Sequence, residues 1–118
     1  QGGTLRTFIS FKLIYDFMVY FYKISRKFPK DIKYSLVTEI KHYLDEVIKL
    51  IIIANDSSNK VNFLSQSLQL LEIIKIKIRL LYSLEIISHK RYDFMARSLT
   101  EISKQLVAWK KWSQSSRK

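Results

Sequence analysis

Glu39, His42 and His89 are the first residues to consider for metal or acid–base chemistry. Glu39 and His42 form a Glu-x-x-His, which binds di-iron in helical bundles when a second copy and further inward-facing carboxylates accompany it. No second copy occurs, and we expect this pair on the solvent face of its helix. The other histidine, His89, has no Cys or Ser nucleophile arrangement around it. We therefore expect no metal, no cofactor and no enzymatic activity.

Basic residues are more informative, because they recur in short clusters. Lys75 and Arg79 lie one helical turn apart beside Glu72. They can contact phosphates, or Glu72 and Lys75 can form a solvated ion pair worth about 0.2–0.5 kcal/mol. Two further clusters flank expected connections that lie at the same end of an antiparallel bundle, where they would form one basic pole. The basic pole comprises Lys23, Arg26, Lys27 and Lys30 together with His89, Lys90 and Arg91.

The segment "WKKW" (109–112) interleaves aromatic and cationic residues. Aromatic rings stack on bases and cations hold phosphates in proteins that bind single strands. Lys110 and Lys111 therefore join the predicted nucleic-acid-binding residues. Trp109 falls on an apolar stripe and is expected to be structural, whereas Trp112 lies on another face, where oligomer packing is favoured over base stacking.

Composition limits the fold that must position these residues. A chain of 118 residues with 47% hydrophobic residues suits one packed domain. Only 2 Gly and 1 Pro are present, too few for the turns of an all-β fold, so the chain is expected to be mostly helical. The absence of cysteine excludes disulfides and fits a reducing compartment.

The charge balance predicts an anionic partner. Lys and Arg total 21 against 10 acidic residues, a net charge of +11, which favours nucleic acid, an anionic membrane surface or an acidic protein. No charge-free apolar run approaches about 18–20 residues, and no signal peptide is visible, so we expect a cytoplasmic protein. Residues 1–8 open with "QGGT" and are expected to be disordered or extraneous, with the fold at 9–113 and a basic tail at 114–118.

Apolar periodicity divides the chain into four helices. Pro29 ends the first, the loop "NDSSN" (55–59) separates the second from the third, and Ser88 is the expected N-cap of the fourth. The predicted helices are 9–28, 31–54, 60–87 and 89–113. Long helices with short connections predict an all-α, up-down antiparallel four-helix bundle.

The segment 72–88, "EIIKIKIRLLYSLEIIS", alternates Ile with Lys or Arg at its centre, as a half-buried strand would. No Gly, Pro, Asn or Asp occurs between Phe63 and Tyr92, so a strand there would have no turn at either end. We therefore interpret the alternation as two apolar stripes on one helix.

Two helices have more apolar surface than a single core requires. The third has a second stripe that includes Ile87, and the first has one that includes Phe11, so self-association is expected. The alternative is a wide core-facing arc with scattered surface apolar residues. The predicted oligomer interface comprises Tyr15, Met18, Tyr22, Ile73, Ile76, Leu80, Leu84 and Trp112, with Ile52 and Ile53 as further candidates.

These features together resemble a known family. The sequence shows "FPK" after the first helix, Glu72 followed by Lys75 and Arg79, Ser88 four residues before Tyr92, and a late Trp-Lys. Over about positions 13–113 this order is similar to that of the accessory variability determinant (Avd) proteins of diversity-generating retroelements. The Avd proteins belong to a wider family of four-helix bundles, which also includes proteins encoded in ribosomal RNA intervening sequences.

The resemblance implies a homopentameric barrel that contacts template RNA or an RNA–DNA hybrid and docks a reverse transcriptase during mutagenic retrohoming, in a bacterial or phage-encoded system. We accordingly expect a non-catalytic accessory nucleic-acid-binding protein. The alternative is an oligomeric protein-interaction scaffold of the intervening-sequence type without nucleic-acid specificity of its own. A membrane-surface binder ranks below both, because the apolar stripes suit helix partners.

Overall fold

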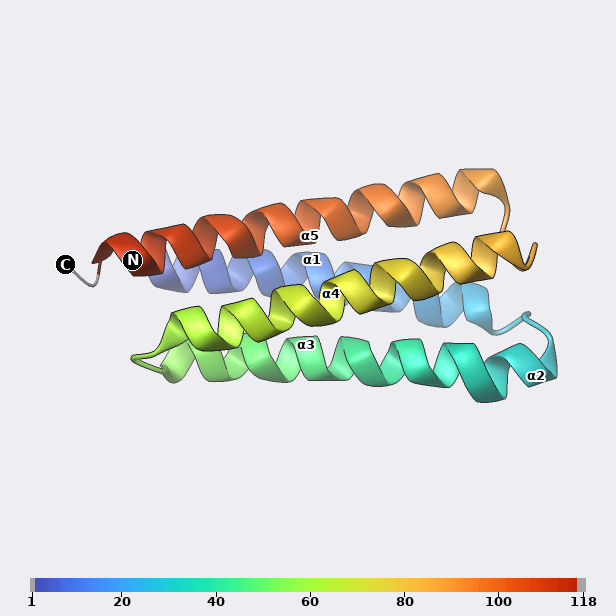
Figure 1. Cartoon of the computed structure of the whole chain (residues 1–118), viewed down its shortest axis with the longest axis horizontal. Helices are drawn as coiled ribbons and strands as arrows, with labels where there is room; N and C mark the ends of the chain where they lie inside the picture. Colours follow the sequence, from blue (N-terminus) through green and yellow to red (C-terminus); the bar gives the residue numbers. More distant parts are fainter. Residues whose placement is uncertain (1, 117–118) are drawn as a thin grey trace.

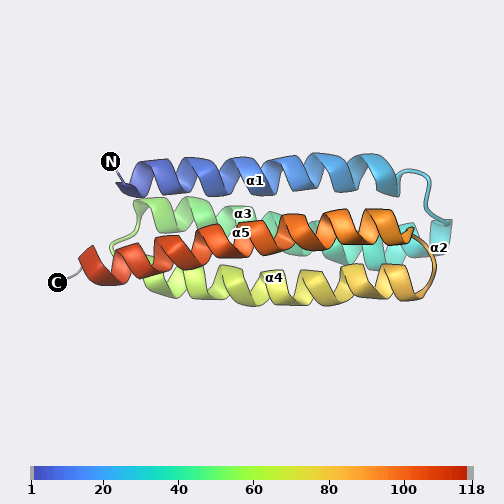
Figure 2. The ribbon, with the colours of Figure 1, turned by 90° about the horizontal axis from the view of Figure 1, so that it is seen from above.

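A computed structural model describes residues 2–116 as a set of helices (Figure 1). The elements are α1 (Gly2–Ser25), α2 (Lys30–Ile32), the π-helical turn η1 (Lys33–Val37), α3 (Thr38–Asp56), α4 (Lys60–Ser83) and α5 (His89–Ser116). Because α2, η1 and α3 follow one another without a break, the chain makes four rods, each antiparallel to the one before (Figure 2). Over these residues no strand is present, and the prediction of an all-α four-helix bundle is confirmed.

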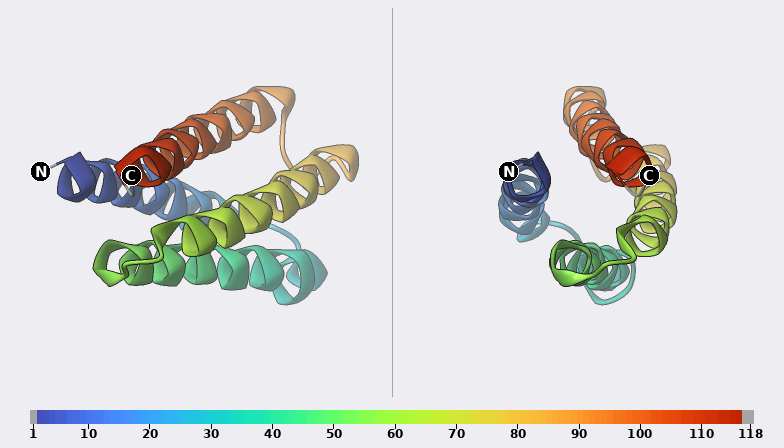
Figure 3. Two further views of the ribbon diagram at one scale, coloured as in Figure 1. Left: turned by 60° about the vertical axis from the view of Figure 1, so that its left-hand side comes forward. Right: turned by 90° about the vertical axis from the view of Figure 1, so that its left-hand side faces the viewer.

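The rods surround a single core, and the molecule is about 50 Å along its longest axis. α1 packs against α3 and α5, and α4 packs against the same two helices. Seen end-on, α1 and α4 lie diagonally opposite each other (Figure 3). The outer surfaces of α1 and α4 therefore belong to different edges of the bundle.

The predicted apolar stripes form this core. Ile74 and Ile78 of the alternating segment are buried while Ile76 is 69% exposed, so the segment is helical as predicted. The predicted seam of α5 is also buried, and Tyr92 packs at its edge. This seam consists of Met95, Leu99, Ile102, Leu106 and Trp109, each at most 1% exposed.

The ends of the chain differ from the prediction. α1 begins at Gly2 and not at Ile9, so residues 2–8, which were expected to be disordered or extraneous, are helical. Thr7 Oγ1 donates a hydrogen bond of 2.9 Å to Asn55 Oδ1 near the end of α3, which ties this turn to the bundle. At the other end, α5 continues through 114–116, so these residues of the expected tail are helical, and residues 117–118 lie outside the described part.

α4 ends at Ser83, earlier than the predicted Ile87. Glu85 adopts a left-handed backbone with φ 62°, which a helix cannot continue. Its amide donates to the Tyr82 carbonyl and that of Ile86 to the Leu81 carbonyl, each at 2.9 Å, the two hydrogen bonds of a Schellman motif. The chain then folds back and buries Ile87, which was wrongly assigned to the outer apolar stripe.

The start of α5 agrees with the prediction. Ser88 Oγ accepts a hydrogen bond of 3.1 Å from the Arg91 amide, the geometry of an N-cap. The turn η1 was not predicted: residues 31–54 were expected to form one regular helix, yet five of them form a π turn.

Candidate nucleic-acid interface

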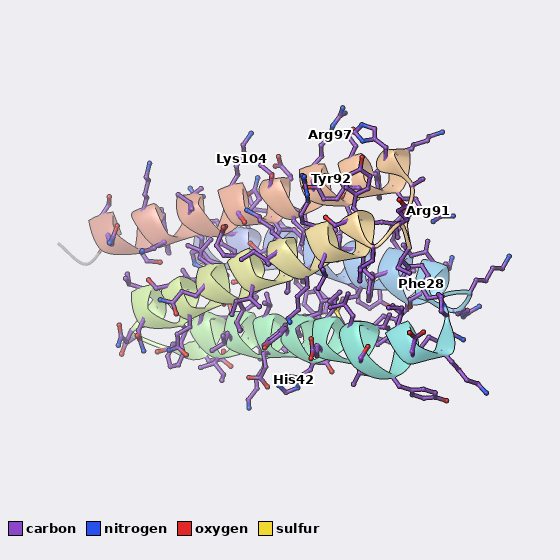
Figure 4. The ribbon with its side chains drawn as sticks, turned by 45° about the vertical axis from the view of Figure 1, so that its right-hand side comes forward. Phe28, His42, Arg91, Tyr92, Arg97 and Lys104 are labelled. Atoms are coloured by element: carbon purple, nitrogen blue, oxygen red, sulfur yellow. The ribbon has the colours of Figure 1, made fainter. Side chains whose placement is uncertain are left out.

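The two clusters of the basic pole lie at the same end of the bundle, as the antiparallel topology predicted. The connection from α1 to α2 and the one from α4 to α5 are neighbours at the right-hand end of Figure 1. Figure 4 shows Phe28 of the first connection and Arg91 of α5 at this end. Arg91 Nη1 also donates a hydrogen bond of 3.4 Å to the Tyr20 hydroxyl, which ties the first turn of α5 to α1, the helix that precedes the other cluster.

The cations of the basic pole are exposed and have no acidic partner among the described residues. None of its Lys and Arg side chains forms an ion pair with any residue from 2 to 116. Asp31 and Glu85 are exposed acids in the same segments, but neither is within ion-pair distance of these cations. Ion pairs within residues 2–116 therefore do not offset the charges of the pole. These charges belong to Lys23, Arg26, Lys27, Lys30, Lys90 and Arg91.

The structure separates Lys75 from Arg79, which were predicted as a pair. Lys75 is half-buried, and its Nζ lies 3.0 Å from Glu72 Oε2, so this cation has the ion pair given above as the alternative to phosphate contact. Arg79 is exposed and has no carboxylate partner in the described part of the chain. Of the two, Arg79 is therefore the stronger candidate for the predicted phosphate contact.

Arg79 lies over two stacked aromatic rings. Its guanidinium is 5.7 Å from the ring centre of Tyr82 and 5.6 Å from that of Tyr92, and these two rings stack at 4.8 Å. A hydrogen bond with Tyr92 and the electrostatic attraction of that residue raise the pKa of Arg79 above its ordinary value. His89 Nδ1 lies 3.3 Å from the Tyr82 hydroxyl, so this group extends to the basic pole.

Lys110 and Lys111 lie near the opposite end of the bundle from the basic pole (Figure 1). With a helical rise of about 1.5 Å per residue, Lys110 is about 30 Å along α5 from Arg91. Trp109 is fully buried, which confirms its predicted structural role. Trp112 packs partly against the core of its own chain, and its predicted part in an oligomer interface stays a prediction.

Two apolar patches lie on the diagonal helices. The α4 patch comprises Ile73, Ile76, Leu80 and Leu84, which are 36–69% exposed. The α1 patch comprises Phe11, Tyr15, Val19 and Tyr22, which are 37–53% exposed. It lines a groove of about 540 Å³ together with Met18, which packs partly against the core, and Ile48 of α3. Ile52 of α3 is also exposed, at 51%, and Ile53 is half-buried.

The Glu-x-x-His pair is placed apart from any inward-facing site. Glu39 Oε1 forms an ion pair of 2.8 Å with Lys77 Nζ of α4. His42 projects away from the bundle (Figure 4). Within residues 2–116 no group of three His, Cys, Asp or Glu side chains could hold a metal ion. No helix there is long and apolar enough to cross a membrane.

Comparison with known families gives one result. The family described as bAvd-like matches residues 8–113, which is most of the chain. The chain belongs to the bAvd-like family. This is a family of accessory proteins and is not a known enzyme family. No curated protein and no solved structure matches the chain.

Some residues that matter in this bAvd-like chain were missed. Lys60 Nζ donates to the carbonyls of Ala54, Asn55 and Ser57 at 2.9–3.0 Å and so caps the end of α3. Lys33 and Lys41 line a groove beside the basic pole. This groove was not predicted, because residues 31–54 were expected to form one regular helix without the π turn. The only sequence signal for the Lys60 cap was the position of this lysine just after the "NDSSN" loop. The sequence has no signal for the π turn.

Proposed function

We propose that this bAvd-like chain is a non-catalytic accessory protein that binds template RNA or cDNA in the cytoplasm and docks a reverse transcriptase in retroelement mutagenic retrohoming. One observation carries the proposal: exposed cations from two distant segments converge at one end of the bundle, and no described residue offers them an acidic partner. Family membership and a net charge of +11 support it. Because such contacts reach phosphates and not base edges, binding is expected to tolerate many sequences.

A salt titration tests the proposal. Affinity for single-stranded RNA should fall by about 0.7 log units per phosphate contact for each tenfold rise in salt. The double variant Lys27→Gln/Lys90→Gln should therefore reduce this slope by about 1.4. The matched control, Lys49→Gln/Lys104→Gln, removes two exposed charges outside the pole and should retain most of the slope. Salt-independent affinity, or equal loss in both variants, contradicts the proposal.

Lys110→Gln/Lys111→Gln examines the far end of α5 separately. A smaller slope in this variant means that one ligand extends along the whole bundle. An unchanged slope restricts binding to the pole half.

We also propose that the α1 patch of one copy meets the α4 patch of the next. The two patches are different surfaces on two diagonal helices, which suits a head-to-tail contact, and such a contact forms a ring when the rotation between successive copies closes. A homopentamer is the ring that the family resemblance implies. Exposed apolar surface of this kind on a small helical bundle is typical of interfaces.

Mixing two damaged copies tests the head-to-tail contact. Tyr15→Glu damages the α1 patch and Ile76→Glu the α4 patch, and each variant alone should be monomeric by light scattering. A mixture should form a dimer and nothing larger, because the two variants supply one intact patch each. Val107→Glu is the control, because Val107 is 39% exposed on α5 outside both patches. Single variants that keep the wild-type mass contradict this contact.

An alternative function is an oligomeric protein-interaction scaffold without nucleic-acid affinity of its own. The two apolar patches favour it as much as they favour the accessory role, because neither patch needs RNA. Capture of the reverse transcriptase by a protein that fails the salt titration would support the scaffold.

A further inference from the structure

A basic groove lies next to the basic pole, and we name it the elbow groove. It lies between the end of α1 and the π turn η1, has a volume of about 340 Å³, and has no Asp or Glu in its lining. Three cations line it: Arg26 from the pole, and Lys33 and Lys41, which no earlier prediction included. None of the three forms an ion pair with a described residue.

The π turn presents an aromatic ring at the rim of this groove. In η1 the Thr38 hydroxyl donates to the Lys33 carbonyl five residues before it, at 2.9 Å. Leu36 and Val37 are both buried by this wider turn, and Tyr34 is left 78% exposed, the most exposed large hydrophobic side chain of the described residues. Single π turns often occur at functional sites. Because the Tyr34 ring is so exposed, it does not contribute to packing within the fold.

The inner wall of the elbow groove is also aromatic. Lys41 Nζ lies 4.2 Å from the centre of the Tyr22 ring, so this cation is held over a ring in the lining of the groove. Burial, and to a lesser extent the charge of Asp45, raise the pKa of Tyr22.

We propose that the elbow groove binds one unpaired nucleotide of a single strand, with its phosphate on Arg26, Lys33 and Lys41 and its base stacked on Tyr34. This rests on the proposed function, and it adds a strand-type preference that the basic pole alone cannot provide. Bases in a duplex are already stacked and cannot reach an isolated ring. An acidic peptide would use the cations but leave the exposed ring without a partner.

The test compares single and double strands. Labelled oligouridylate, the deoxyribose strand of matching length and a duplex are titrated by fluorescence anisotropy with wild type, Tyr34→Ala and Tyr34→Phe. Tyr34→Ala should weaken single-strand binding about tenfold and leave duplex binding unchanged, because stacking on a side chain is lost. Tyr34→Phe should bind like wild type, since stacking needs the ring and not the hydroxyl. The two strands show whether the 2′-hydroxyl matters.

A charge variant tests the phosphate half of the groove. Lys33→Gln/Lys41→Gln should lower the salt slope by about 1.4, with Lys49→Gln/Lys104→Gln as the control of equal charge. Circular dichroism shows whether each variant keeps its helices, and the exposure of Tyr34 makes its replacement harmless to the fold.

The outcomes separate this proposal from the proposed function. If the wild type binds no strand, the proposed function fails and the elbow groove with it. If the wild type binds and Lys27→Gln/Lys90→Gln weakens binding, but Tyr34→Ala matches wild type on single strands, the groove proposal alone is overturned. Polyglutamate that displaces the strand equally from wild type and Tyr34→Ala would likewise overturn it and indicate an acidic protein ligand.

Discussion

Glu85 occupies a backbone position that favours glycine, and replacing it gives a sharp prediction. Its φ of 62° lies in the left-handed region, and its amide completes the Schellman motif that ends α4. Glycine takes this conformation without a Cβ clash. Glu85→Gly should therefore stabilise the protein without changing the fold.

The magnitude follows from two opposing terms. A residue with a Cβ in the left-handed region costs about 1–2 kcal/mol. Glycine offsets about 0.5–1 kcal/mol of this gain, because it has more conformational freedom to lose when the unfolded chain folds. The net gain is about 0.5–1 kcal/mol, which for a domain of this size raises Tm by about 2–4 °C.

Two controls isolate the backbone effect. Glu85→Gln removes the negative charge near the C-terminal end of α4 but keeps the Cβ, so the gain of Gly over Gln measures the backbone term. Glu101→Gly makes the same substitution at an exposed site inside α5, where glycine should destabilise by roughly 0.5–1 kcal/mol. Thermal and urea unfolding measure the stability of all three variants, Glu85→Gly, Glu85→Gln and Glu101→Gly. If Glu85→Gly is no more stable than Glu85→Gln, the strain argument is refuted.

Three further predictions concern individual contacts. Tyr22, whose pKa is raised above 10.0, contributes stability that is fully present below pH 10 and lost as pH rises through the raised value. Tyr22→Phe should therefore unfold less readily than wild type in alkaline urea titrations, and parallel pH curves for the two would disprove this. Lys60→Met should destabilise by about 1–2 kcal/mol in urea, because the three carbonyls at the end of α3 lose their donor, while Lys49→Met should be nearly neutral. Ser88→Ala should cost about 1 kcal/mol through loss of the N-cap of α5, and Ser98→Ala, whose hydroxyl bonds back to Phe94 O within the helix, should cost less.

Repeated local patterns were predictable from the sequence. The apolar period of α5 recurs over five turns, so a mistake at one position could not change which face is buried. The same holds for α4, where the helical period outweighed the Ile-Lys alternation and correctly separated Ile78 from Ile76. The basic pole also followed from the sequence, because an antiparallel bundle places alternate connections at the same end.

Features that depend on one residue or on distant contacts were not predictable. α4 ends where Glu85 turns left-handed, and no glycine marks the place. Thr7 is fixed by Asn55, 48 residues later, so periodicity could not show that α1 starts at Gly2. Arg79 gains its aromatic neighbour Tyr92 from α5, which distinguishes it from Lys75 although the two looked equivalent in sequence.

The proposed head-to-tail contact has a consequence for the basic pole. If each copy is related to the next by rotation about an axis parallel to the rods, all poles lie on one rim of the ring and their cations act together. A two-fold dimer with its axis perpendicular to the rods would place the two poles at opposite ends. Assembly therefore decides how many phosphates one strand can contact.

This reasoning predicts a difference in salt dependence between assembled and monomeric protein. Wild type should show a steeper slope than Tyr15→Glu, which retains every cation of its pole but is expected to lose the ring. Equal slopes for the two, with the monomeric state of Tyr15→Glu established by light scattering, would mean that each chain binds its strand alone. The ring would then serve the polymerase and not the RNA.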